Sequence, residues 1–286
     1  MENGDIIFTS GQGPLVRQGP CGEVKWAINE HFHHAIEKMP NGNIIAGYNN
    51  EPNIVSPPER DIIDHGFAIV SPEGEVLKRY SLANILIENG YRGLLYGFWR
   101  IPEDLIHLND AQPIYESDEY VKKGDIMISP RNISTIIQYR PSTDEVIRVR
   151  TGPWLYQHDI DYQGDGVFSI LGNDIVLSSR RLIDGHNNIY LWDVKDDSIK
   201  KLFPEHMKSV KTKTQGLHRI LPNGDVFIEE QKSHVLHRIG ASGHRWSFVN
   251  SISEKEIGAL HWSRYLLPRE IDLEWLRKLN CQNKQM

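Results

Sequence analysis

Residues 124–132 read GDIMISPRN, and close copies of this stretch occur at four other places along the chain. In each copy a glycine in a turn is followed by alternating large apolar and small residues. Glycine supplies the positive φ that such a turn needs, and the alternation is typical of a β-strand. The other copies are GDIIFTSGQ from Gly4, GNIIAGYNN from Gly42, GVFSILGND from Gly166 and GDVFIEEQK from Gly224. The repeat predicts an architecture of five equivalent units.

Each unit continues after its glycine strand with two further strands that form a hairpin. In four units one more strand precedes the glycine, which predicts four strands per unit: the preceding strands are 33–39, 107–115, 158–163 and 217–221. The first unit lacks this strand, whereas residues 259–267, ALHWSRYLL, form an unpaired strand pattern near the C-terminus. We therefore predict an all-β fold, a β-propeller closed by pairing of 259–267 beside GDIIFTS in the first blade.

The number of blades depends on one long interval between the repeated glycines. The spacings are 38, 82, 42 and 58 residues, so the second is about twice the repeat. A sixth blade could lie there, but residues of about 84–103 lack the two-hairpin pattern and are interpreted as an insertion. The prediction is one domain over residues 1–286 with five four-stranded blades, six being the alternative. The apolar spacing of residues 269–280 predicts a short C-terminal helix.

Composition excludes several classes of function. The chain has 286 residues, a formal charge of −6 and no basic block, which argues against a nucleic-acid partner. No apolar run reaches the roughly 20 residues that span a bilayer, so no membrane partner is expected. MENGDIIFTS lacks the features of a signal peptide, which predicts a cytoplasmic protein as written, or a periplasmic or secreted one if a leader was removed. The oligomeric state stays open.

Two cysteines and 13 histidines complete this description. Cys21 and Cys281 could approach each other if the ring closes, but the missing leader argues against a disulfide, and both readings stay open. The histidines follow the repeat, because every predicted innermost strand carries one or two of them: His33 and His34, His107, His158, His218 and His261. Innermost strands line the axis of a propeller, so these side chains should converge there. His65 and six further histidines fall in turns or outer strands and receive no role.

A second set of polar residues follows the same repeat. Seven positions after the repeated glycines stand Asn49, Arg131, Asn173 and Gln231, where the first unit has Gly11. Imidazoles and amides around one guanidinium are suited to binding a sulfate, phosphate or carboxylate. Because successive strand residues alternate between faces, only one of His33 and His34 is expected to face the axis.

A metal site is the competing interpretation of the histidines. Three imidazoles can hold a transition metal, but such sites in propellers usually add carboxylates. Asp110 and Asp159 are the only carboxylates adjacent in the repeat, so no metal ligand is assigned. For His218 and His261, taken singly, a packing or capping role is about as expected as a functional one.

With these residues identified, the chain resembles the arylsulfotransferase (arylsulfate sulfotransferase) family of β-propellers. Three separated stretches carry the resemblance, over about residues 5–175: HHAIEKMPNGNIIAG, HLNDAQPI followed by GDIMISPRNISTIIQY, and WLYQHDIDYQGDG. The resemblance implies a cofactor-independent transfer of a sulfuryl group from a small-molecule aryl sulfate to a phenolic or other hydroxyl acceptor.

The family's residue roles transfer position by position. The resemblance implies that His158 is the nucleophile and forms a sulfohistidine, while His107 and Arg131 bind the sulfuryl oxygens. Asn109 would orient the substrate, and His34, or else His33, would lie on the acceptor side. Asn49, Asn173, Gln231, His218 and His261 are the further substrate-binding candidates. The alternatives are a propeller that binds an anionic small molecule or glycan without reacting, and a metal-dependent hydrolase or lyase.

Overall fold

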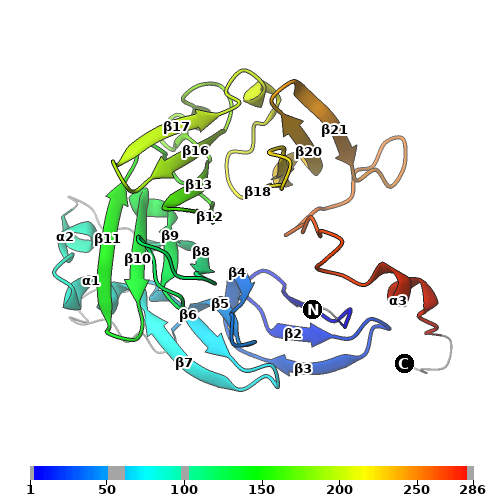
Figure 1. Ribbon diagram of the computed structural model, residues 1–286, viewed down its shortest axis with the longest axis horizontal. Helices are drawn as coiled ribbons and strands as arrows, with labels where there is room; N and C mark the ends of the chain where they lie inside the picture. Colours follow the sequence, from blue (N-terminus) through cyan, green and yellow to red (C-terminus); the bar gives the residue numbers. More distant parts are fainter. Residues whose placement is uncertain (1–2, 51–61, 98–102, 282–286) are drawn as a thin grey trace.

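The chain forms a ring of sheets around a common axis, and the structure is a computed structural model that describes residues 3–50, 62–97 and 103–281 (Figure 1). Five sheets make up the ring, which confirms the predicted five-bladed β-propeller. Four of them have four strands and the first has three. Among the described residues, no helix is long and apolar enough to cross a membrane.

The strands follow the predicted units closely. Blade 1 contains β1 (Ile6–Thr9), β2 (Leu15–Gln18) and β3 (Val24–Ile28). Blade 2 contains β4 (Phe32–Lys38), β5 (Ile44–Asn49), β6 (His65–Val70) and β7 (Val76–Ser81). Blade 3 contains β8 (Leu108–Pro113), β9 (Ile126–Pro130), β10 (Thr135–Arg140) and β11 (Glu145–Thr151). Blade 4 contains β12 (Asp159–Gly164), β13 (Val167–Gly172), β16 (Asn188–Asp193) and β17 (Ser198–Leu202), with a small extra hairpin of β14 (Ile175–Val176) and β15 (Arg181–Leu182). Blade 5 contains β18 (Leu217–Ile220), β19 (Val226–Glu230), β20 (Val235–Gly240) and β21 (Gly243–Val249).

The repeated glycines do what the sequence pattern requires of them. All five have positive φ, between 75° and 90°. Each lies in the turn that leads into β1, β5, β9, β13 or β19. An L-residue with a side chain rarely adopts this conformation, which explains the glycine in every copy. The turn reverses the chain, so that β4, β8, β12 and β18 become the innermost strands of their sheets (Figure 1).

Two helices lie between β7 and β8, in the segment interpreted as an insertion. They are α1 (Leu82–Glu88), whose N-terminus is capped by Ser81, and α2 (Gly93–Tyr96). Their apolar side chains are buried together with residues of blades 2 and 3, so the helices fill the outer space between these blades. The end of the predicted insertion, residues 98–102, lies outside the described residues.

Ring closure differs from the prediction. Residues 259–267 form no strand, and among the described strands β1 pairs with β2 alone. Side chains take the backbone groups that a sheet would have used: the Glu229 carboxylate accepts hydrogen bonds from the Trp262 and Ser263 N–H groups, and Arg219 donates to the Tyr265 carbonyl (2.5 Å). The segment still reaches the innermost strand of blade 2, because Arg264 donates to the Ile36 carbonyl (3.0 Å).

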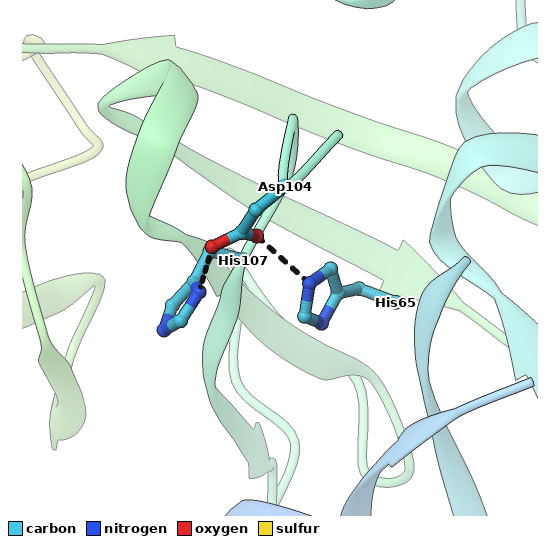
Figure 2. Close-up of side chains that lie close together, drawn as sticks. All are labelled: His65, Asp104 and His107. Carbon is cyan, nitrogen blue, oxygen red and sulfur yellow. Dashed lines mark hydrogen bonds and ion pairs between the residues drawn. The ribbon is translucent and has the colours of Figure 1, made fainter. Parts of the chain in front are cut away.

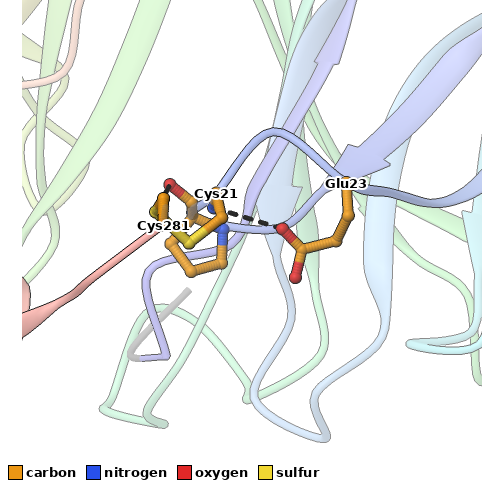
Figure 3. The surroundings of a disulfide bond; sticks show 4 residues. Cys21, Glu23 and Cys281 are labelled. Atoms are coloured by element: carbon orange, nitrogen blue, oxygen red, sulfur yellow. Dashed lines mark hydrogen bonds between the residues drawn. A yellow bond between two sulfur atoms is a disulfide. The ribbon is translucent and has the colours of Figure 1, made fainter. Parts of the chain in front are cut away.

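A disulfide joins the two ends of the chain instead. Cys21, in the turn between β2 and β3, is bonded to Cys281, with 5.3 Å between the Cα atoms (Figure 3). The predicted C-terminal helix is present as α3 (Leu273–Lys278), capped by the Asp272 carboxylate. It packs on the first blade so closely that a Cβ at Gly4 would lie 2.7 Å from the Trp275 ring. The disulfide and α3 therefore connect the C-terminus to blade 1.

Candidate functional site

Four residues singled out from the sequence lie together at one end of the axis. The His34 ring centroid is 5.1 Å from that of His107 and 5.5 Å from that of His158. Burial is the first cause that lowers the pKa of all three imidazoles, and the nearby charge of Arg131 lowers it further. The three histidines lie at or just before the N-terminal ends of the innermost strands of blades 2, 3 and 4. Because these strand ends meet at the axis, equivalent residues of three blades form one site.

His33 and His34 both belong to this group, contrary to the expected alternation. The register of β4 against β5 shifts between His33 and Ile36, and His34 has a φ of 51°. A bulge of this kind redirects a side chain that regular pleating would send to the other face. As a result, the Nδ1 atoms of the two rings lie 2.8 Å apart.

His65 and Asp104, to which the sequence analysis gave no role, complete the cluster. The histidine cluster therefore consists of His33, His34, His65, His107 and His158. Asp104 lies between two of its rings: one carboxylate oxygen is 2.9 Å from His65 Nε2 and the other is 2.6 Å from His107 Nδ1 (Figure 2). Although burial opposes ionisation, these contacts hold the pKa of Asp104 far below its usual range. Its position three residues before His107 was the available sequence signal.

Backbone hydrogen bonds hold the segment 104–107 against the end of β9. The Arg131 N–H donates to the His107 carbonyl (3.0 Å) and the Asn132 N–H to the Ile106 carbonyl (3.1 Å). The Asn132 side chain also donates to the Asp104 carbonyl (2.6 Å). His107 has a φ of 50°, as His34 has 51°, and left-handed backbone at a histidine costs roughly 1–3 kcal/mol. The surrounding bonds maintain this conformation, which places the imidazole in the cluster.

His158 is the most deeply buried of the predicted catalytic residues. It is 1 % exposed, neither ring nitrogen bonds a side chain among the described residues, and the nearby Gly216 backbone slightly favours its protonated form. Burial, reinforced by the charges of Arg131 and His107 against the opposing effect of Asp159, lowers the pKa of His158 to about 3. The ring is therefore neutral at pH 7, and its lone pair is available.

Buried amides position the chain immediately before His158. The Gln157 side chain donates to the carbonyls of Pro130 (3.2 Å) and Thr135 (2.7 Å) in blade 3. Asn109 donates to the Gln157 carbonyl (3.1 Å), so its contact in this structure is with the backbone that carries His158. The Asn109 Oδ1 atom is buried without a hydrogen-bond partner.

Trp262 covers the cluster from the C-terminal segment. Its ring centroid lies 5.8 Å from that of His34 and 5.6 Å from that of His158. The backbone of Trp262 has a φ of 55°, so it too is held in a left-handed conformation. The repeat pattern marked its neighbour His261, which is exposed in the structure, whereas Trp262 contacts the cluster.

The remaining substrate-binding candidates are placed less uniformly. Asn49 contacts the cluster, with its Oδ1 atom 2.7 Å from His33 Nε2. Asn173 donates to the Gln215 carbonyl (2.9 Å) and to that of Thr212, while Gln231 hydrogen bonds His261, which is exposed. These pairs use the candidates' polar groups within the fold.

His218 belongs to a second group of titratable side chains further along the axis. Asp159 Oδ2 lies 2.6 Å from His218 Nδ1, and Ser169 Oγ lies 2.7 Å from His218 Nε2. Although burial opposes it, the Asp159 charge raises the pKa of His218, while burial and the same charge raise the pKa of Asp161 to about 7. Within the described residues, this group and the set of His65, Asp104 and His107 each have the donor atoms and the spacing to bind a metal ion.

A cavity of about 600 Å³ opens at the opposite ends of the innermost strands. Its lining includes Glu37, Gln112, Asp161, Arg219 and Arg264, and it does not include the histidine cluster. Because β4, β8 and β12 each run from the cluster towards this cavity, the two sites lie at the two ends of the same strands.

Comparisons with known proteins agree with this architecture. Two solved structures share the fold at 12 % identity: a protein of unknown function from Bacteroides caccae (TM-score 0.56, 85 % of this chain and 76 % of the other) and a streptogramin B lyase (TM-score 0.50, 87 % and 66 %). No curated protein matches the chain. The family model for arylsulfotransferase (ASST) matches residues 10–251, a range that contains the whole histidine cluster. The chain therefore belongs to the arylsulfotransferase family.

Proposed function

We propose that the protein is a cofactor-independent sulfotransferase that moves a sulfuryl group from an aryl sulfate to a phenolic or other hydroxyl acceptor through a sulfohistidine at His158. The observation that carries the proposal is the state and surroundings of His158: its ring is buried and neutral at pH 7, and it lies beside His34 and the charge of Arg131. Membership of the arylsulfotransferase family supports the same reaction class.

In the first half-reaction, the lone pair of His158 attacks sulfur and an N–S bond forms. The bond between sulfur and the aryl oxygen breaks, and its electron pair leaves with that oxygen. His107, in its protonated form, gives a proton to the departing phenolate; burial lowers the pKa of His107, and the adjacent Asp104 carboxylate acts against that effect. Arg131 binds the sulfuryl oxygens, whose charge is best matched by a guanidinium.

In the second half-reaction, the neutral His107 takes the proton of the acceptor hydroxyl while the acceptor oxygen attacks sulfur. The N–S bond then breaks and the electron pair returns to His158. A covalent intermediate divides one displacement into two easier ones, and His107 alternates between acid and base. His34 faces both His107 and His158 and is assigned to the acceptor side.

The disulfide bears on the compartment in which this reaction would occur. Disulfides persist in oxidising environments and are rare in the cytosol. The Cys21–Cys281 bond thus supports a periplasmic or secreted location rather than the cytoplasmic one expected from the N-terminal sequence.

Replacing His158 by Asn tests the proposal. Asn approximates the size of the imidazole but has no attacking lone pair of this kind, so turnover of a chromogenic aryl sulfate should fall by several orders of magnitude. The unmodified protein, quenched during turnover and examined by mass spectrometry, should carry one acid-labile sulfuryl group on the peptide that contains His158. Near-ultraviolet circular dichroism should be unchanged in the variant.

Two results would decide against covalent transfer at His158. Turnover retained in the variant would remove its role as nucleophile. If the unmodified protein turned over none of a panel of aryl sulfates but bound sulfate or a phenyl sulfate by calorimetry, the site would be a binding site only. Hydrolysis that depends on added metal would instead support a metal-dependent hydrolase.

A further inference from the structure

We infer that Asp104 is a positioning residue that fixes the proton positions of two arms of the histidine cluster, so that His107 and His34 both present Nε2 to the substrate. This inference rests on the proposed sulfuryl transfer and adds a residue and a hydrogen-bond chain to it. The chain runs from Asp104 directly to His107, and through His65 and His33 to His34.

The direct arm follows from what a carboxylate can do. An ionised carboxylate only accepts hydrogen bonds, so both imidazoles beside Asp104 must donate N–H to it. Asp104 Oδ2 lies 2.6 Å from His107 Nδ1, and Asp104 Oδ1 lies 2.9 Å from His65 Nε2 (Figure 2). In a neutral His107 the proton therefore lies on Nδ1 and the lone pair lies on Nε2. When His107 is protonated, Nε2 carries the proton that the leaving oxygen needs.

The second arm continues from the other side of the His65 ring. With its proton on Nε2, His65 has a lone pair on Nδ1, which faces His33 Nε2 at 3.4 Å. His33 Nε2 also lies 2.7 Å from Asn49 Oδ1, an acceptor, so that nitrogen carries the proton. His33 Nδ1 is then an acceptor and receives the Nδ1–H of His34 at 2.8 Å. The remaining lone pair of His34 is on Nε2.

A metal ion is the alternative occupant of the same three side chains. Their ligand atoms lie within 4.8 Å of one another, and two histidines with one carboxylate suit a transition metal. Two observations favour hydrogen bonding. The Arg131 guanidinium lies 3.9 Å from Asp104 Oδ2, where it would repel a dication, and both carboxylate oxygens already have short contacts with ring nitrogens. Asp104 is thus best described as the acceptor that orients two rings.

The test is the variant Asp104→Asn, read by NMR as well as by turnover. The amide oxygen can accept one N–H, but its nitrogen must donate, so His107 or His65 has to change tautomer. Long-range ¹H–¹⁵N correlation spectra above pH 7 should give Nδ1-protonated His107 and His34 in the unmodified protein, and a changed pattern in the variant. Turnover should fall by roughly 10²- to 10⁴-fold, the range for removing a proton-transfer group or its orienting carboxylate.

Two further variants separate this role from a general structural one. Asp165→Asn makes the same chemical change at an exposed carboxylate paired with Lys195, and it should leave spectra and turnover unchanged. The double variant His65→Leu/Asn49→Leu removes both acceptors of the His33 Nε2–H. It should preserve the tautomer of His107 while His34 becomes a mixture, because only the second arm is cut.

Three results would overturn the inference. The first is an unmodified protein in which neutral His107 carries its proton on Nε2. The second is an Asp104→Asn variant with unchanged spectra and turnover. The third is one equivalent of a transition metal in the protein as purified, lost in Asp104→Asn. If the unmodified protein transfers no sulfuryl group, the proposed function fails, whereas the tautomers of the resting protein still decide this inference.

Discussion

Burial sets the protonation of the site residue by residue. His33 and His158 are both nearly inaccessible, and removal from water is the first cause that lowers the pKa of each to about 3. For His33 the neighbouring His65 and His107 add to the effect. Neutral imidazoles can act as nucleophiles and hydrogen-bond acceptors at pH 7. Burial destabilises their charged form and thereby keeps them in this reactive neutral state.

The same burial predicts how stability depends on pH. The unfolded chain binds protons at these histidines near pH 6.5, whereas the folded protein binds them only near pH 3. Their contribution is therefore complete above about pH 6.5 and is lost as the pH falls towards 3. The slope is about 1.4 kcal/mol per pH unit for each histidine. Urea unfolding at several pH values between 7.5 and 4 should show the decline.

A matched pair of variants isolates the histidine contribution from that of the carboxylates. His158→Asn should have a shallower decline than the unmodified protein, while substitution of the exposed His244 by Asn should not. Equal slopes in all three proteins would mean that His158 is not held neutral by the fold.

At the scale of elements, the site combines segments that obey the repeat with segments that do not. The starts of β4, β8 and β12 bring equivalent histidines together, as the repeated pattern predicts. The bulge in β4 adds the second histidine of its pair, and the irregular segment 259–267 adds Trp262. The residues of the site that break the repeat therefore come from segments with irregular backbone.

Trp262 predicts a preference for aromatic donors. Aromatic pairs with centroids 4.5–7 Å apart contribute about 0.5–1.5 kcal/mol beyond area burial, so loss of the indole should lower kcat/KM by up to roughly tenfold. The variant Trp262→Ala should show this loss with a phenyl sulfate, and Trp262→Phe should recover most of it. Trp246→Ala, on the outer strand β21, serves as the control. A normal kcat/KM in Trp262→Ala would show that the indole does not contribute to the transition state.

In the whole molecule, the disulfide closes a ring that none of the described strands closes. Blade 1 has three strands, and Cys21 and Cys281 are separated by 260 positions in sequence. A crosslink across so long a loop restricts the unfolded chain strongly, and loss of a native disulfide typically costs about 2–5 kcal/mol. Cys281→Ser should therefore unfold at a lower urea concentration than the unmodified protein without reductant.

The double variant Cys21→Ser/Cys281→Ser should match the single one, and reductant should bring the unmodified protein to the same midpoint. If all of these midpoints coincide, the C-terminal segment is held by its packing and hydrogen bonds alone. In that event α3 and the hydrogen bonds of Arg264 would account for closure.

The blades and the core of the site could be predicted from the amino-acid pattern alone. The turn before each repeated strand needs a glycine with positive φ, and this need depends only on neighbouring residues. GDIMISPRN and its copies therefore predicted five units and their innermost strands. Equivalent positions in a ring converge, and this placed His34, His107, Arg131 and His158 at one end of the axis.

The remaining features could not be predicted, because they depend on contacts between residues that are far apart in sequence. Asp104 and His65 meet across two blades, and no repeat links their positions. The bulge that admits both His33 and His34 depends on register against β5. Residues 259–267 have the sequence pattern of a strand. Their backbone groups nevertheless form hydrogen bonds with the Glu229 and Arg219 side chains of blade 5 instead of pairing with β1. Which of two such partners forms the hydrogen bonds depends on how the blades pack in the folded ring.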